Sequence, residues 1–222
     1  MSTSHDFIEA IKAGEIQKVK QMLDRDPALV DARAGNGLSA VLIAAYYNEP
    51  EIAHGLAQRR ADLDIFEASA AGVLSRVQEL IAQQPDLINA YAPDGFQPLG
   101  LAAFFGYTSI AEFLLTKGAA VNSPSQNRMR VMPLHSAIAN RRTEIVRLLL
   151  EHGADVNAAQ ADDFTPLHEA AQNGMLEVTR WLLDRGANVN AKLTDGKTPL
   201  ALAVEYKHDD VVELLRRYGA TM

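Results

Sequence analysis

Histidine and acidic side chains are the residues of this sequence most able to bind a metal or to transfer a proton. His135 and His168 each follow a Pro-Leu pair, and Glu169 stands directly after His168. A metal site needs such residues one helical turn apart or gathered in a compact cluster. Adjacent residues of a helix point to different sides, so His168 and Glu169 do not meet this requirement. We expect instead that each histidine hydrogen-bonds within its own turn and fixes the start of the next helix.

Two acidic clusters also have a structural interpretation. Asp162 and Asp163 stand directly before a predicted helix, where aspartate is favoured as a turn or cap residue. The segment 208–210, His-Asp-Asp, starts the last predicted helix, where negative charge complements the helix dipole. We predict no metal site and no cofactor at either place.

Motifs for covalent or phosphate chemistry are missing from the sequence. It contains no cysteine, which excludes thiolate nucleophiles, zinc fingers and disulfides. The glycine-rich phosphate loops G-x-x-x-x-G-K-S/T and G-x-G-x-x-G are not present, and neither is the G-x-S-x-G motif. We therefore expect that the chain is not an enzyme. The alternative is an enzyme with an unrecognised surface site, which several strongly perturbed acid and base groups in one cleft would favour.

The composition describes a globular, acidic chain. Its 222 residues are 48% hydrophobic and 22% charged, and the formal net charge is −7. This balance lacks the basic surface of a nucleic-acid binder. No apolar run reaches the ~18–20 residues that cross a bilayer, and the first residues do not resemble a secretory signal. We expect a monomeric cytoplasmic protein that binds neither nucleic acid nor membranes.

Short motifs recur along the chain with a nearly constant period. Pro-Leu pairs begin at positions 98, 133, 166 and 199, and Gly-Ala pairs begin at 118, 153, 186 and 219. Within residues 162–192, apolar residues spaced by three and four predict two short helices, with Gly174 between them and Gly186 after them. Such a unit cannot bury its apolar stripe alone, so the units must stack. We predict one domain, 1–222, of seven units: 7–33, 36–66, 67–91, 94–124, 127–159, 160–192 and 193–222.

The third predicted unit is incomplete. Residues 7–64 align without a gap on residues 65–122, which indicates that a pair of units was duplicated. The residue between the two helices of each unit falls at 14, 48, 72, 106, 141, 174 and 207, so one step is only 24 residues. We predict that the third unit has both helices but no protruding turn, because Asp64, Ile65 and Phe66 lead almost directly into its first helix.

Two of the recurring motifs resemble the signature of a known family. Residues 165–171, Thr-Pro-Leu-His-Glu-Ala-Ala, are similar to the T-P-L-H-x-A-A motif of ankyrin repeats. Residues 153–158 and 186–191, Gly-Ala-Asp-Val-Asn-Ala and Gly-Ala-Asn-Val-Asn-Ala, look like the end of that repeat. The resemblance implies an all-α solenoid of about seven helix-turn-helix units with degenerate terminal caps, whose first helices line a concave face. It also implies binding of other proteins through that face and through the tips of the turns.

The resemblance also indicates which residues would meet a partner. In the second and fourth units, large apolar groups occupy the family's partner-facing positions, where polar groups are usual. Half exposed, five aromatic side chains of ~150–250 Å² each would form a patch of roughly 400–600 Å², as large as a monomer usually shows. The candidate partner-binding residues are Tyr46, Tyr47, Phe96, Phe104, Phe105, Arg128, Arg130 and Phe164.

We expect the aromatic residues to form a notch on the concave face. The tyrosine pair 46–47 would be one wall, the phenylalanine pair 104–105 the other, and Ala70 and Ala71 the floor. A notch of this kind suits an apolar anchor or an amphipathic helix, and Arg128 and Arg130 would meet acidic residues of the partner. Two alternatives remain open: the rings fill the gap left by the missing turn, and the arginines are solvated edge charges.

The expected function is therefore non-catalytic recognition of a protein or peptide. The alternative within the same architecture is a dedicated inhibitor or immunity-type partner of an enzyme. Trp181 lies on the apolar stripe of a second helix, and we expect it in the core.

Overall fold

Fourteen α-helices and three short 3-10 segments make up the computed structural model, which describes residues 3–221. The α-helices follow one another as seven helix-loop-helix hairpins, so the all-α repeat architecture predicted from the sequence is confirmed. The chain divides into two compact units, Met1–Leu87 and Ile88–Met222. The assignment of all seven repeats to one domain stays a prediction.

The first compact unit contains three hairpins. They are α1 (Thr3–Lys12) with α2 (Ile16–Arg25), α3 (Ala40–Tyr46) with α4 (Pro50–Gln58), and α5 (Ile65–Ala71) with α6 (Leu74–Gln83). A 3-10 segment, Pro27–Asp31, follows α2. Helix α3 packs against α1, α4 and α5, and its residues 40–45 are all buried. The first helix begins at Thr3, earlier than the predicted boundary at residue 7, because the polar segment before Phe7 is also helical.

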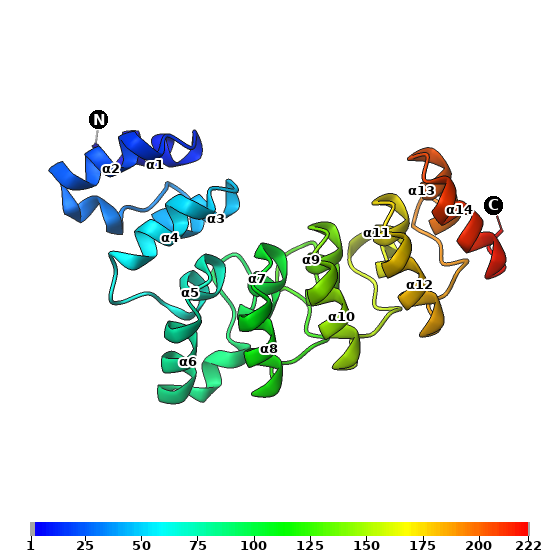
Figure 1. Ribbon diagram of the computed structural model, residues 1–222. Coiled ribbons are helices and arrows are strands. Elements are labelled where there is room, and N and C mark those ends of the chain that lie inside the picture. The colour runs from blue at the N-terminus through cyan, green and yellow to red at the C-terminus, as the bar shows by residue number, and fades with distance from the viewer. Residues whose placement is uncertain (1–2, 222) are drawn as a thin grey trace. The chain divides into compact units, whose positions relative to one another are not determined.

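The second compact unit contains four hairpins. They are α7 (Pro98–Phe105) with α8 (Thr108–Thr116), α9 (Pro133–Ala139) with α10 (Thr143–Glu151), α11 (Pro166–Gln172) with α12 (Leu176–Asp184), and α13 (Pro199–Glu205) with α14 (Asp209–Arg217). The 3-10 segments Pro85–Asn89 and Ala161–Asp163 precede α7 and α11. Helices α7, α9, α11 and α13 stack in this order (Figure 1). Their buried alanines, among them Ala103, Ala137 and Ala170, let the backbones approach closely.

A hydroxyl residue directly before proline or alanine fixes the start of several first helices. The side-chain oxygen of Ser39 accepts a hydrogen bond from the N–H of Leu42 at 3.4 Å, and Thr198 accepts one from Ala201 at 3.2 Å. Side-chain caps of this kind satisfy N–H groups that have no partner within the helix. The Thr-Pro pairs of the sequence therefore mark helix starts, because the threonine hydroxyl caps the helix that begins at the proline.

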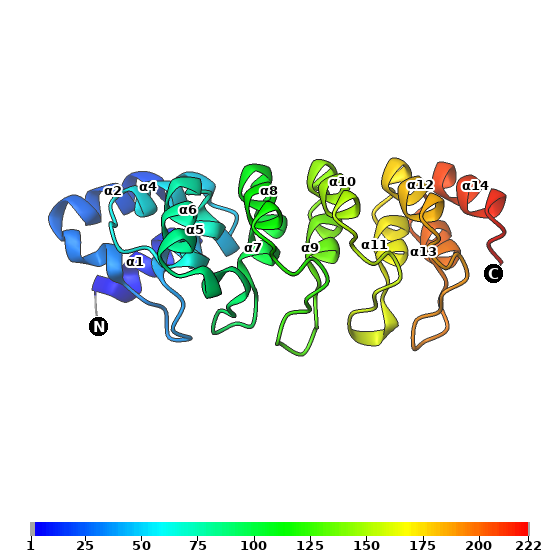
Figure 2. The same cartoon turned by 90° about the horizontal axis from the view of Figure 1, so that it is seen from below.

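Turns project along one edge of the second unit (Figure 2). In the turn 92–96, the N–H of Ala92 donates to the carbonyl of Phe96 at 2.8 Å, and the turns 160–164 and 193–197 close in the same way. Successive turns are joined by backbone hydrogen bonds, from Gln126 to Gly95 at 2.8 Å, from Ala161 to Met129 at 3.0 Å and from Thr194 to Asp162 at 3.2 Å. The edge is therefore a connected surface rather than a set of separate loops.

The third repeat lacks such a turn, as the short spacing predicts. Helix α4 ends at Gln58, and α5 begins at Ile65 directly after its N-cap residue, Asp64. Asp64 Oδ1 accepts hydrogen bonds from the N–H groups of Phe66 at 2.9 Å and Glu67 at 2.8 Å. No hairpin separates Asp64 from Glu67, so this prediction is confirmed.

Asparagines after the second helices join neighbouring repeats of the second unit. The Nδ2 of Asn122 donates to the carbonyl of Gly153 at 3.1 Å, and its Oδ1 accepts from the N–H of Asp155 at 2.8 Å. Asn157 and Asn190 make the same pair of bonds in the following repeats.

Trp181 is half-buried, which corrects its predicted place in the core. None of the helices within residues 3–221 has the length and apolar character that crossing a membrane requires.

Candidate functional site

His168 has the structural role predicted from its motif. Its Nδ1 lies 2.8 Å from Thr165 Oγ1, and both the ring and the hydroxyl form a capping box at the start of α11. The Nε2 also donates to the carbonyl of Lys197, at 3.3 Å in the turn of the next repeat. This second bond joins two repeats and was not anticipated from the sequence, because the carbonyl partner has no side-chain signature.

His135 departs from the prediction. Its Nε2 donates to the carbonyl of Phe164 in the next turn at 3.1 Å, which repeats the inter-repeat link of His168. Within its own turn, however, Met132 replaces the threonine, and the buried Nδ1 has no hydrogen-bond partner among the described residues. Burial lowers the pKa of His135 to about 4, although the bond to Phe164 opposes this shift. Both histidines therefore act as neutral donors between stacked repeats.

The first acidic cluster lies in a turn, and the second begins helix α14, as predicted. Asp162 and Asp163 have backbone φ angles of 61° and 59°, a left-handed conformation that aspartate tolerates better than most residues. At the start of α14, His208 Nε2 donates to the carbonyl of Gln172 at 3.0 Å. No group of three metal-binding side chains comes together within residues 3–221.

One other carboxyl group has an unusual environment. Burial raises the pKa of Glu169 to about 7, although a hydrogen bond from Asn173 opposes this shift. Glu169 lies on α11 and His135 on α9, and no hydrogen bond joins the two among the described residues.

In the first unit, the predicted aromatic pair lies at the end of α3. Tyr47 is 48% exposed, and Tyr46 is half-buried. Lys12, at the end of α1, places its Nζ 5.7 Å from the centre of the Tyr47 ring and 2.8 Å from Glu9 Oε1. The ends of two first helices thus present an exposed ring beside a cation. By contrast, Ala70 and Ala71 are only 1% and 2% exposed, so the predicted floor of the notch is wrong.

In the second unit, the four predicted phenylalanines are all half-buried. The rings of Phe104 and Phe105 meet edge to face, with centroids 5.0 Å apart. Phe164 stacks on its own repeat, with its ring 5.7 Å from that of His168, and Phe96 lies close to Gly100. The two walls of the predicted notch belong to different compact units, and the notch stays a prediction.

The turn of the fifth repeat presents the most exposed apolar residue at a turn tip within residues 3–221. Met129 is 51% exposed and stands between Arg128 and Arg130, which are also exposed. Asn127 holds the tip, since its Oδ1 accepts from the N–H of Met129 at 3.1 Å. Arg130 has a φ of 53° at the place where the turns 92–96 and 193–197 have Gly95 and Gly196. The sequence indicated the two arginines but not the methionine, because Met residues usually fill cores.

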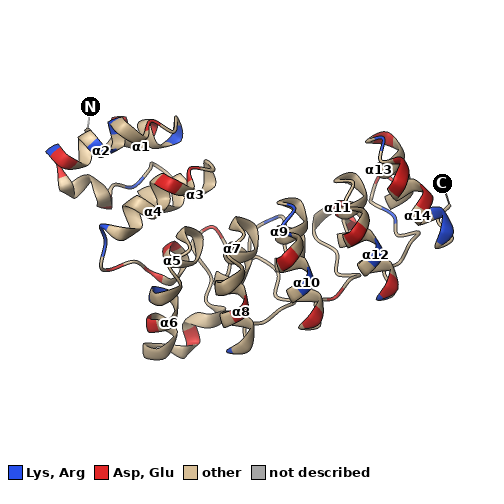
Figure 3. Cartoon of the chain, viewed as in Figure 1, with Lys and Arg blue, Asp and Glu red and all other residues tan. Residues whose placement is uncertain are grey.

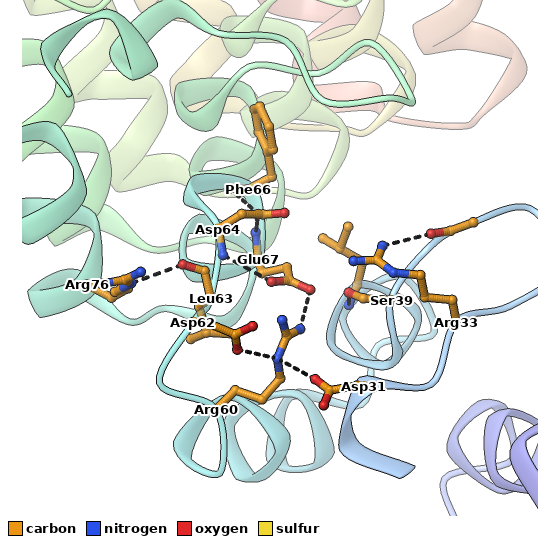
Figure 4. Close-up of polar contacts among 12 residues, drawn as sticks. Asp31, Arg33, Ser39, Arg60, Asp62, Leu63, Asp64, Phe66, Glu67 and Arg76 are labelled. Carbon is orange, nitrogen blue, oxygen red and sulfur yellow. Dashed lines mark hydrogen bonds and ion pairs between the residues drawn. The ribbon is translucent and has the colours of Figure 1, made fainter. Parts of the chain in front are cut away.

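A buried ion pair in the first unit was not predicted at all. Arg60 Nη1 donates to Glu67 Oε1 at 2.6 Å, and these side chains are 8% and 2% exposed (Figure 4). Arg60 Nε also pairs with Asp31 at 3.2 Å and Asp62 at 3.1 Å. Glu67 in turn accepts from the N–H of Asp64 at 3.1 Å. Arg60 thereby connects the 3-10 segment after α2 with the start of α5.

Taken by geometry alone, each compact unit consists of helical hairpins whose first helices pack on one another, which places the chain among the helical repeat proteins. A family model described as ankyrin repeats (3 copies) matches residues 65–160 and 158–222. Because these matches cover more than half of the chain, it belongs to the ankyrin repeat family.

Several curated proteins are similar to this chain. A rat (Rattus norvegicus) protein named Ankyrin repeat and SAM domain-containing protein 6 is 35% identical over 152 residues, which is 68% of this chain and 14% of that protein. A putative ankyrin repeat protein of Rickettsia felis is 30% identical over 132 residues, 57% of this chain and 58% of the relative. A human palmitoyltransferase, ZDHHC13, is 30% identical over 115 residues, 50% of this chain and 17% of the enzyme. The chain thus spans only a small part of the rat and human relatives.

These relatives define what the family shares. Ankyrin repeats are generally protein–protein interaction modules and are generally not catalytic themselves. They also occur as part of enzymes, as the palmitoyltransferase illustrates. The activity that the name of a relative states is therefore a property of that relative alone.

Proposed function

We propose that this chain is a non-catalytic recognition module that binds a protein or peptide partner through the ends of its first helices and the tips of its turns. The observation that supports this proposal is the distribution of exposed large apolar residues. Of the five such side chains within residues 3–221, Tyr47 and Tyr206 end first helices, Val204 lies on α13, and Met129 lies at a turn tip. Only Tyr218 belongs to the end of a second helix.

Exposed aromatic and methionine side chains are suited to this role. Aromatic residues and methionine are enriched at the centres of interfaces, where a few anchors contribute most of the binding free energy. In Tyr47 the ring is already flanked by the Lys12 ammonium, so a partner would meet both an apolar face and a positive charge. We further propose that the module acts as a cytoplasmic monomer, which cell fractionation and light scattering test.

The experiment compares two tyrosines of similar exposure. The full chain is immobilised, partners from the native cell extract are identified by mass spectrometry, and the purified partner is then titrated calorimetrically. Tyr47→Ala and Met129→Ala should each weaken binding by about 2 kcal/mol. Tyr218→Ala is the matched control, because Tyr218 is 40% exposed but lies at the end of a second helix. A partner that binds the first two variants as tightly as the wild type, or that is lost with Tyr218→Ala, contradicts the proposal.

A further inference from the structure

A cleft of about 210 Å³ opens in the first unit between α2 and α4, the second helices of its first two hairpins. We call it the α2–α4 cleft. Its floor is apolar, since Val19, Leu23, Ile52 and Leu56 line it and each of them is at most 4% exposed. The proposed function refers to the ends of first helices and the tips of turns, so this cleft is a separate surface.

The cleft opens where one repeat lacks a side chain. Gly55 lines it from α4, seven residues after Asn48, which lies between the two helices of this hairpin. The first and third repeats have the polar residues Gln21 and Glu79 at this place. The fourth to seventh repeats have large apolar residues there, which are Phe113, Leu148, Trp181 and Leu214. On the same face of its second helix, the second repeat therefore leaves open the volume of one large apolar side chain.

Neither the backbone nor the packing of α4 requires glycine at this position. Gly55 has an ordinary helical conformation, whereas Gly106, at the end of α7, has a φ of 92°. A Cβ atom at Gly55 would have no other atom within 4 Å, so a side chain would fit there. The open volume is also sufficient for one ring, since an engineered apolar cavity of about 150 Å³ accommodates benzene. The cleft can therefore accept an aromatic side chain from outside the chain.

Charges of both signs surround the open position. Arg59 Nη2 lies 3.4 Å from Asp24 Oδ1, so the C-terminal ends of α2 and α4 meet. Equivalent helices of stacked hairpins run in the same direction, and four residues earlier Lys20 and Gly55 therefore face each other across the cleft. Glu51 lines the cleft one turn before Gly55, and Figure 3 shows negative charge near the start of α4 and positive charge at its end. Lys20 and Glu51 are exposed and form no ion pair within residues 3–221.

We propose that the α2–α4 cleft binds an amphipathic helical segment of a partner protein, and that one aromatic side chain of this segment fills the place left open by Gly55. A groove between two helices accepts the apolar face of a third helix, and aromatic residues are frequent anchors in such pockets. An acidic residue of the segment pairs with Lys20, and a basic residue pairs with Glu51. This charge pattern is complementary to the rim and sets the position of the segment along the cleft.

The first test uses the aromatic group without the rest of the segment. The ¹⁵N-labelled full chain is titrated with N-acetyltryptophanamide, and the backbone amide signals are recorded by NMR. We expect saturable shifts at Val19, Gly55 and Leu56. Gly55→Leu should weaken binding about tenfold or more, because the leucine side chain takes the volume that the ring needs. Leucine stands at the equivalent place in two other repeats, so the melting temperature of this variant should not be lower than that of the wild type.

The control adds the same side chain beside the cleft. His54 is exposed on α4 and does not line the cleft, so His54→Leu should leave the affinity unchanged. The second unit gives an internal control, since Trp181 takes the equivalent place on α12 and the amides of this helix should not shift. Shifts that do not saturate, equal shifts in α12, or an equal affinity of Gly55→Leu and the wild type would overturn the proposal.

A second arm tests the helical segment and its charges. A blocked, alanine-based helical peptide carries one tryptophan with a lysine one turn to one side and a glutamate one turn to the other, and its neutral counterpart has glutamine at both charged positions. The charged peptide should bind more tightly than the neutral peptide and than N-acetyltryptophanamide, and salt should reduce this difference. Lys20→Gln and Glu51→Gln should each reduce it as well. Equal binding of the two peptides would contradict the charge pattern, and tighter binding of N-acetyltryptophanamide than of either peptide would contradict a helical segment and indicate a small-molecule site. Shifts of the same amides that follow the concentration of the chain without any probe would indicate a second copy as the occupant and would also overturn the proposal.

Discussion

Replacing Arg60 by methionine tests the most deeply buried ion pair of the first unit. Arg60 lies in the connection between α4 and α5, and its contact with Glu67 is 2.6 Å long. Methionine keeps much of the side-chain volume and removes the charge. The variant leaves the Glu67 carboxylate buried, with the N–H of Asp64 at 3.1 Å as its remaining hydrogen-bond donor.

The expected cost follows from the burial of each partner. Removing one member of a buried ion pair costs about 3–5 kcal/mol, because the other charge is left uncompensated. The contacts of Arg60 with Asp31 and Asp62 add little, since those side chains are 65% and 77% exposed and exposed pairs contribute about 0–1 kcal/mol. We therefore expect Arg60→Met to lower the unfolding free energy of the first unit by about 3–5 kcal/mol.

A double variant separates the charge effect from the loss of packing. Glu67→Gln removes the buried charge and keeps an acceptor for the N–H of Asp64, since glutamine also completes a capping box. Arg60→Met combined with Glu67→Gln should therefore recover most of the stability that the single arginine variant loses.

Hydrogen exchange of the amides in α5 and α6 is the suitable measurement. The only tryptophan, Trp181, belongs to the second unit, so its fluorescence does not report on the first. Protection of α5 should fall in Arg60→Met and return in the double variant, while α11 and α12 stay unchanged. A loss smaller than about 1 kcal/mol, the range of exposed pairs, would refute the reasoning. A double variant as unstable as the single one would refute it as well.

Four further outcomes are expected. Gly55 lies within α4 with open space around its missing side chain, so Gly55→Ala should raise the unfolding free energy by about 1 kcal/mol in urea denaturation. Burial raises the pKa of Glu169 from 4.5 to about 7, so ionisation of this carboxyl destabilises the fold as the pH rises through that range. Glu169→Gln should therefore raise the melting temperature at pH 8 but not at pH 4. The stability that depends on His135 changes with pH in the opposite direction, because its pKa of about 4 is below the ordinary 6.5. The stabilising effect of the neutral ring is present above pH 6.5 and is lost as the pH falls toward 4. In unfolding measured as a function of pH, His135→Leu should flatten this decline. Tyr47→Ala should leave the unfolding midpoint nearly unchanged, because the side chain is 48% exposed. A large loss of stability would contradict this and indicate that the ring packs in the core.

The repeat architecture was predictable because it rests on local chemistry that recurs. Thr198 caps its helix, and Gly186 has a φ of 84° after the second helix, so both residue types are needed wherever the chain turns in the same way. The missing turn of the third repeat was predictable for the same reason, since the length of a connection limits what it can form. The exact start of α1 was not, because polar residues extend a helix without adding to its apolar period.

The candidate site was predicted less well, since exposure depends on packing between segments that are far apart in the sequence. The aromatic character of positions 46 and 47 was visible, but the division into a half-buried and an exposed ring was not. Ala70 and Ala71 have the same residue type whether they line a groove or fill a contact, and the structure buries them. Met129 was missed because only the conformation of its turn distinguishes it from a core methionine.

The third residue of the first helix shows how one position can serve two kinds of contact. In α11 it is His168, which reaches forward to the carbonyl of Lys197 in the following turn. In α5 it is Glu67, which reaches back to Arg60 in the preceding connection and through it to Asp31. The first link is neutral and depends on the turn that follows, whereas the second is ionic and replaces the turn that is missing before α5. Stacking in the first unit should therefore respond to charge substitutions, and stacking of α9, α11 and α13 should respond to loss of an imidazole donor.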